Sequence, residues 1–189
     1  MSLRLSLNVL ASTLLLAACD SGADGPAQPQ AEFPGDKLEL TGEIDRTLAG
    51  SLMPAVNLTD PQGNTLNLGA LQGQPVLLNL WATWCAPCVV EMPMLDDLAD
   101  ELKGKVRVVT VSQDLRGAEM VEPFFAEKGF RNLEPWLDPE NELGLGYGGG
   151  SLPLTVLFDA QGQELLRVVG GYDWSSEEAR AAIEEALAE

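Results

Sequence analysis

Apolar residues divide the chain into alternating candidate strands and helices. Residues 75–81 form a short apolar run typical of a strand buried on both faces, and residues 105–112 give a second such strand. Between them, apolar side chains recur every three or four positions, which predicts a helix from about Cys85 to Lys103. Pro93 is expected to kink that helix, because proline cannot donate a hydrogen bond to the preceding turn. A second helix is predicted over residues 117–130.

Two antiparallel hairpins are predicted outside this central unit. Alternating residues over 55–68 surround a turn rich in proline, glycine and asparagine, and residues 154–159 and 163–169 flank a second turn. A last helix follows Ser175 and Glu178, which fit a capping box. The order β-α-β-α-β-β-α predicts an α/β fold with a mixed central sheet flanked by helices, extended at its N-terminus by the first hairpin.

The start of the chain indicates export. Arg4 precedes an apolar run too short to span a membrane, so residues 1–18 are interpreted as a signal peptide. The segment LAAC, which ends at Cys19, resembles the lipobox of bacterial lipoproteins, and this implies a lipidated cysteine held in a membrane. Asp20 resembles an inner-membrane retention signal, so we expect an inner-membrane lipoprotein whose domain faces the periplasm. The alternatives are the outer membrane or extracellular face, and a soluble secreted protein.

Residues 20–36 have the composition of a flexible linker. They are rich in glycine, proline, alanine, glutamine and aspartate and have almost nothing to bury. The expected organisation is therefore a signal peptide over 1–18, a lipidated N-terminus and linker over 19–50, and one folded domain over 51–189. Residues within 37–50 are ambiguous, and we expect any order there to come from packing on the domain.

Charge and composition narrow the range of functions. The chain has 29 acidic and 11 basic residues, a net charge of −18, and no histidine. An acidic field of this size repels phosphate backbones, which excludes nucleic acid as a partner. The chain has three cysteines, of which two, Cys85 and Cys88, are separated by only two residues at the predicted junction of a strand and a helix.

Three interpretations of this cysteine pair are open. A structural zinc site needs four ligands, and the chain offers no histidine and only one further cysteine, at its other end. A bracing disulfide is possible in an exported protein, although so short a loop removes little entropy from the unfolded chain. The redox interpretation is favoured, because a helix N-terminus stabilises a thiolate. On it Cys85 is the nucleophile, and Cys88, one turn later, resolves the mixed disulfide.

A family resemblance supports the redox interpretation. The segments NLWATWCAPCVVEMP, SLPLTVLFDAQGQ and GGYDWSSEEARAAIEEAL resemble TlpA- and ResA-like thiol-disulfide oxidoreductases, which are membrane-tethered members of the thioredoxin superfamily. The resemblance covers roughly residues 53–188. It implies a thioredoxin-like fold, a redox disulfide between Cys85 and Cys88, and neither a metal nor another cofactor.

The resemblance also assigns roles to residues around the cysteines. Pro153 falls where the family has a cis-proline opposite the dithiol, and Leu152 before it would offer backbone groups to an extended substrate segment. Glu91 corresponds to an acidic residue near the dithiol that could take the proton of Cys88. The alternative for Glu91 is an ordinary solvated helix glutamate.

Four further positions complete these expectations. The resemblance implies that Trp84 covers the dithiol and touches the partner, and that Ala86 and Pro87 contribute to substrate binding. Trp81 is expected in the core. Asn79 stands where thioredoxin itself has a buried acid, so that acid cannot carry the proton here.

The glycine-rich stretch at residues 144–150 does not indicate nucleotide binding. Its letters match a dinucleotide fingerprint, which requires a preceding strand and a following helix that the surrounding pattern does not give. We interpret it as a mobile loop leading to the proline turn.

The expected activity is reduction of disulfides in client proteins. By resemblance, the clients would be apocytochrome c or copper-centre assembly proteins, and the electrons would come from a membrane-embedded donor of the DsbD or CcdA kind. The alternatives are a disulfide oxidant or isomerase and a non-enzymatic adaptor lipoprotein that uses the fold only for binding.

Overall fold

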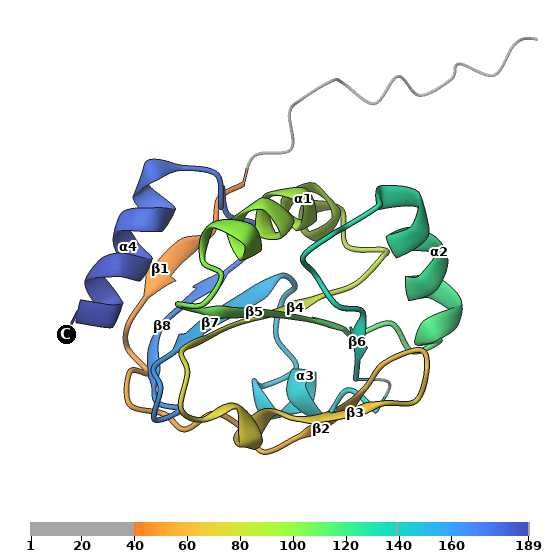
Figure 1. Ribbon diagram of the computed structural model, residues 1–189, viewed down its shortest axis with the longest axis horizontal. Coiled ribbons are helices and arrows are strands. Elements are labelled where there is room, and N and C mark those ends of the chain that lie inside the picture. The colour runs from red at the N-terminus through yellow and green to blue at the C-terminus, as the bar shows by residue number, and fades with distance from the viewer. Residues whose placement is uncertain (1–39, 139, 189) are drawn as a thin grey trace, which may run out of the picture. The chain divides into compact units, whose positions relative to one another are not determined.

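A computed structural model describes residues 40–138 and 140–188 (Figure 1). The signal peptide, Cys19, Asp20 and the start of the linker lie outside these residues. In chain order the elements are β1 (Glu43–Asp45), β2 (Asn57–Thr59), β3 (Thr65–Asn67), the 3₁₀ helix η1 (Leu68–Leu71), β4 (Val76–Trp81), α1 (Ala86–Glu101), β5 (Arg107–Ser112), α2 (Ala118–Lys128), β6 (Trp136–Leu137), α3 (Glu142–Gly146), β7 (Leu154–Phe158), β8 (Glu164–Val169) and α4 (Glu177–Ala188). None of the described helices combines the length and apolarity needed to cross a membrane.

The strands form one mixed sheet, which confirms the predicted fold class. Its order is β1-β8-β7-β4-β5-β6-β2-β3. In the centre, β4 pairs parallel to β5 and antiparallel to β7, and all six of its residues are buried. The predicted hairpin β2–β3 is present, and a single pair between Thr59 and Leu137 joins it to β6.

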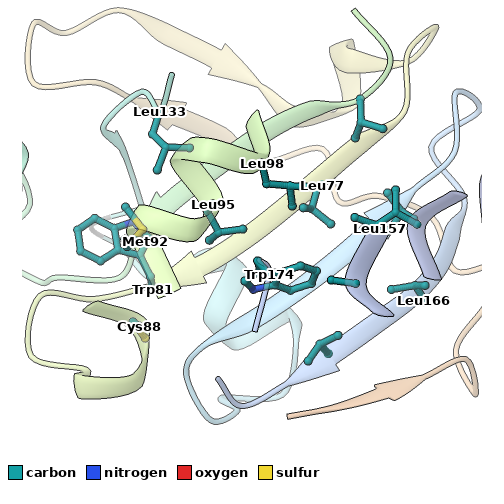
Figure 2. Close-up of a cluster of buried hydrophobic side chains, with 14 of the residues drawn as sticks. Leu77, Trp81, Cys88, Met92, Leu95, Leu98, Leu133, Leu157, Leu166 and Trp174 are labelled. Atoms are coloured by element: carbon teal, nitrogen blue, oxygen red, sulfur yellow. The ribbon is translucent and has the colours of Figure 1, made fainter. Parts of the chain in front are cut away.

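Helices α1, α2 and α4 lie on one side of the central strands, and α3 and the β2–β3 hairpin, which continues the sheet beyond β6, lie on the other (Figure 1). The side chains of β4 alternate between two hydrophobic clusters, as expected for period-two geometry. Leu77 and Trp81 face α1, whereas Leu78 and Leu80 face the hairpin and α3. Figure 2 shows the first cluster, with Trp81, Met92 and Cys88 gathered where β4 leads into α1.

Two strands, the helix α3 and the short 3₁₀ helix η1 were not predicted from the sequence. Strand β1 lies in the segment expected as linker, where it pairs antiparallel with β8, so order begins before residue 51. Strand β6 adds two buried residues to the sheet. Helix α3 occupies part of the stretch interpreted as a loop, and the Asp138 carboxylate accepts hydrogen bonds from the backbone N–H groups of Glu142 and Leu143 at its start.

One local prediction changes in detail. The hydroxyl of Ser176 accepts the hydrogen bond from the N–H of Ala179 at 3.1 Å, so the predicted cap at Ser175 is wrong by one residue. Helix α1 continues through Pro93, and the expected kink there stays a prediction.

Candidate active site

The cysteine pair lies where β4 leads into α1. Cys85 is the N-cap of α1, and its sulfur accepts a hydrogen bond from the N–H of Cys88 at 3.3 Å. The two cysteines form a disulfide. Cys85 retains 5% exposure, whereas Cys88 is completely buried. Of the two cysteines, only Cys85 retains any exposure, and it lies at a helix N-terminus, which favours a thiolate.

The proline loop lies beside the dithiol. The Leu152–Pro153 peptide bond is cis, as expected from the resemblance. Because β7 runs antiparallel to β4, with Leu154 opposite Leu80, the start of β7 meets the end of β4 that leads to Cys85. The carbonyl of Pro153 accepts a hydrogen bond from Gly170 N–H at 2.9 Å. The topology thus brings together two segments separated by more than sixty residues.

Gly171, in the loop after β8, packs closely against Pro87, which lies between the two cysteines. A Cβ atom there would lie 3.0 Å from Cβ of Pro87 and 2.7 Å from a methyl carbon of Leu40. The loop after β8 therefore packs between Pro87 of the cysteine motif and Leu40, which precedes β1. No pattern in the sequence predicted this contact.

Glu91 lies on the side of α1 that is buried, beside the first hydrophobic cluster. It is completely buried, so the solvated alternative for this residue is wrong. One carboxylate oxygen accepts a hydrogen bond from the side-chain amide of Asn79 at 2.8 Å. The other accepts from the N–H of Tyr172 at 3.1 Å and from the indole N–H of Trp174 at 3.3 Å. Cys88 precedes Glu91 by three positions, on the same helix face.

Burial raises the pKa of Glu91 from its ordinary value of 4.5 to about 7. The hydrogen bonds from Tyr172, Asn79 and Trp174 favour the ionised form and oppose this shift, but the loss of solvent outweighs them. A carboxyl group with this pKa can accept and release a proton at neutral pH.

Asn79 connects Glu91 to the sheet. It occupies a position of β4 that faces α1, between Leu77 and Trp81, and its amide also donates to the hydroxyl of Thr155 at 2.9 Å. The sequence identified Asn79 and Glu91 but gave no signal for the partners from β7 and from the loop after β8. Those partners are adjacent only in the folded protein.

Asp114 holds the loop that delivers the dithiol. It is buried at 3% exposure, and its carboxylate accepts hydrogen bonds from the backbone N–H of Thr83 at 2.9 Å and from the Thr83 hydroxyl at 2.8 Å. The hydroxyl of Ser112 donates to the same carboxylate at 2.8 Å. The sequence did not predict this role of Asp114, because a lone aspartate after a strand carries no periodic signal.

The residues expected to contact a substrate surround Cys85 on the surface. Trp84 is 69% exposed, Ala86 is exposed, and Pro87 and Leu152 are half-buried. Over residues 40–138 and 140–188, no group of three or more cysteine, aspartate or glutamate side chains is arranged to hold a metal ion. The reactive groups described at this site are the two cysteine sulfurs and the buried carboxyl group of Glu91.

Comparison with known proteins identifies the family. The family model described as Redoxin matches residues 48–183. Thiol-disulfide oxidoreductase ResA of Bacillus thuringiensis (strain Al Hakam) is 31% identical over 122 residues, which cover 64% of this chain and 69% of the relative. Thiol:disulfide interchange protein DsbE of Pseudomonas fluorescens biotype C is 36% identical over 155 residues, covering 76% of this chain and 83% of the relative.

Solved structures agree with this grouping. A thiol:disulfide interchange protein DsbE from Chlorobium tepidum superposes with a TM-score of 0.65 at 27% identity, covering 74% of this chain and 97% of that chain. The exposed lipoprotein thioredoxin Etrx1 from Streptococcus pneumoniae strain TIGR4 gives 0.56 at 28% identity, covering 68% and 98%. The chain therefore belongs to the Redoxin family and is a protein thiol-disulfide oxidoreductase of the ResA and DsbE type, with a thioredoxin-like fold.

Proposed function

We propose that this protein reduces disulfides of client proteins on the periplasmic side of a bacterial inner membrane, to which Cys19 anchors it through lipid. The observation that carries the chemistry is the order of groups along α1. An accessible sulfur at the helix start is followed, at intervals of three residues, by a buried sulfur and a buried carboxyl group. This arrangement separates attack, resolution and proton transfer between Cys85, Cys88 and Glu91.

The reaction begins with the reduced dithiol. The Cys85 thiolate attacks one sulfur of the client disulfide, which forms a mixed disulfide and releases the first client thiolate. Glu91 takes the proton of the Cys88 thiol, and the resulting thiolate attacks the sulfur of Cys85. The bond between protein and client breaks, and the second client thiolate leaves. The client gains two electrons, and Cys85 and Cys88 return to the disulfide seen here.

The client segment lies across the loop that contains Pro153. The backbone of Leu152 pairs with an extended stretch of the client, as in short β-augmentation. Trp84, Ala86 and Pro87 form the surface around the attacking sulfur. Their exposure beside a nearly buried Cys85 supports this assignment, because a partner must cover them to reach the sulfur.

The clients and the electron donor follow from the family resemblance. We assign the clients to apocytochrome c or copper-centre assembly proteins, and the donor to a membrane-embedded protein of the DsbD or CcdA kind. The lipid anchor is supported by the apolar run before Cys19 and by the similarity to the exposed lipoprotein thioredoxin. Two or more acyl chains hold a protein stably on a membrane, whereas one is marginal.

The first test replaces each cysteine by serine in the full-length chain. Cys85→Ser should abolish insulin reduction, because no accessible nucleophile remains. Cys88→Ser should accumulate mixed disulfides with clients, which non-reducing electrophoresis and mass spectrometry identify. Undiminished function of Cys85→Ser in cytochrome or copper-centre assembly would instead support the adaptor alternative.

The second test concerns the direction of electron flow. A reductant should have a reduction potential near that of thioredoxin, about −270 mV, measured against glutathione buffers. A value near about −120 mV, typical of a strong oxidant, would contradict the proposal.

The third test replaces Glu91 by glutamine. The folded oxidised protein binds one more proton than the unfolded chain between pH 4.5 and about 7, so its free energy of unfolding falls as the pH rises through this range. Glu91→Gln should abolish this fall, which amounts to about 3 kcal/mol, as measured by urea denaturation at several pH values. It should also slow resolution of the mixed disulfide by about 100-fold at neutral pH.

The control for this variant is Asp97→Asn, which changes the charge equally at an exposed position of α1. It should keep both the pH profile and the resolution rate of the wild type. A Glu91→Gln profile parallel to that of the wild type would show that burial does not raise the pKa of Glu91 in solution.

The fourth test addresses anchoring. Cys19→Ser should move the protein from the membrane fraction to the soluble fraction, and processing of the wild type should be sensitive to globomycin. If the variant stays in the membrane fraction, the lipid anchor is not what holds the protein there.

A further inference from the structure

A small pocket lies next to the dithiol. It has a volume of about 240 Å³, and its walls include Trp84 and Leu152, which flank the two halves of the active site. Leu115 and Asn141 complete the walls, together with glycines from the stretch 144–150. Pockets that bind small molecules usually enclose about 300–1,000 Å³. The size therefore suits a single side chain of a larger partner.

The floor of the pocket is fixed to the end of strand β4. Gln113 follows β5 directly, and its backbone N–H donates to the carbonyl of Trp81 at 2.8 Å. The walls are apolar and open, since Leu115 is 80% exposed and Trp84 is 69% exposed. Apolar surface of this kind beside a reactive sulfur indicates a contact site for a partner.

Gln113 is one of five described residues with buried polar side-chain atoms that lack a partner, and the only one of them that lines this pocket. It is 94% buried and lines the pocket, yet neither its amide nitrogen nor its amide oxygen has a hydrogen-bond partner among the described residues. A Cβ atom at Gly144 would meet the amide oxygen of Asn141 first, at 2.0 Å, and the Gln113 oxygen at 3.0 Å. Buried polar groups are almost always paired, so a donor and an acceptor held free here indicate a ligand that supplies both partners.

We propose that this pocket binds the carboxamide side chain of an asparagine or glutamine that lies close to the reacting cysteine of a client protein. A carboxamide pairs reciprocally with Gln113, each amide donating one hydrogen bond and accepting one. A carboxylate cannot donate to the Gln113 oxygen and is repelled by a chain of net charge −18. An apolar side chain leaves both atoms of Gln113 unpaired.

This inference rests on the proposed function, because it requires a client segment lying across the proline loop. When an extended segment pairs with a backbone edge, its alternate side chains enter neighbouring pockets. Leu152 belongs both to that edge and to the wall of this pocket. The pocket would thus select clients, whereas the dithiol performs the chemistry.

The test uses short alanine-, glycine- and serine-based peptides with one cysteine, activated as a mixed disulfide with thionitrobenzoate. Each of the two positions before and after the cysteine is in turn glutamine, methionine or glutamate. The full-length Cys88→Ser protein is reduced, so its Cys85 thiolate attacks the peptide sulfur and thionitrobenzoate leaves with the electron pair. At one position, glutamine should react about tenfold faster than methionine or glutamate, the value expected for two neutral hydrogen bonds.

Variants relate this preference to Gln113. In the Cys88→Ser background, Gln113→Met should reduce the ratio of glutamine to methionine rates to about one. Gly144→Ala should lower the ratio by crowding the side chains of Asn141 and Gln113 at the pocket wall. The matched control is Gln161→Met, at an exposed glutamine in the turn between β7 and β8, which should keep the wild-type ratio. Equal rates for all peptides, or an unchanged ratio in Gln113→Met, would overturn the proposal.

Binding without chemistry separates this inference from the proposed function. Serine analogues of the same peptides should shift the side-chain amide NMR signals of Gln113 only when the peptide contains glutamine at the selected position. If Cys85 fails to react even with a small activated disulfide, the proposed function fails, and these shifts still decide the pocket. Absence of any shift would overturn the pocket alone.

Discussion

Strand β4 is buried on both faces, and the position of every reactive group depends on that burial. Its parallel pairing with β5 and antiparallel pairing with β7 hold it on both sides. Two hydrophobic clusters hold alternate side chains of the same strand. Cys85 follows the end of this strand after a loop that hydrogen bonds to Asp114 hold in place. The helix start, the proline loop and the expected substrate surface therefore meet at the carboxyl end of β4. Open α/β sheets commonly place their sites at the carboxyl ends of parallel strands.

Glu91 is an ionisable residue buried beside an otherwise apolar cluster, and its burial costs free energy. Three hydrogen bonds to its carboxylate reduce the cost of burial without cancelling it, which leaves the pKa near 7. Burial thus disfavours the ionised form of this carboxyl group and brings its pKa close to neutral pH. A pKa in this range is what the proposed proton transfer from Cys88 requires.

In the function proposed here, recognition and chemistry are divided between neighbouring loops. The junction of β4 and α1 positions the cysteines. The pocket around Gln113 is built from the segment after β5, the short helix α3 and the segment before β7. Because loops vary more readily than buried strands, client choice can change while the redox geometry stays constant. Trp84 and Leu152 belong to both regions, so a bound client would contact chemistry and recognition at once.

The sequence by itself determined the central elements and the reactive pair. Hydrophobic periodicity predicted β4, β5, α1 and α2, and turn residues predicted both hairpins, because these signals are local. It missed β1 and β6, which are only three and two residues long and gain their stability from pairing rather than from a pattern of their own. It missed α3, whose start is capped by a side chain in the preceding loop. The burial of Glu91, its partners in β4 and after β8, and the unpaired amide of Gln113 were decided by the tertiary structure alone, because each depends on contacts between segments far apart in the chain.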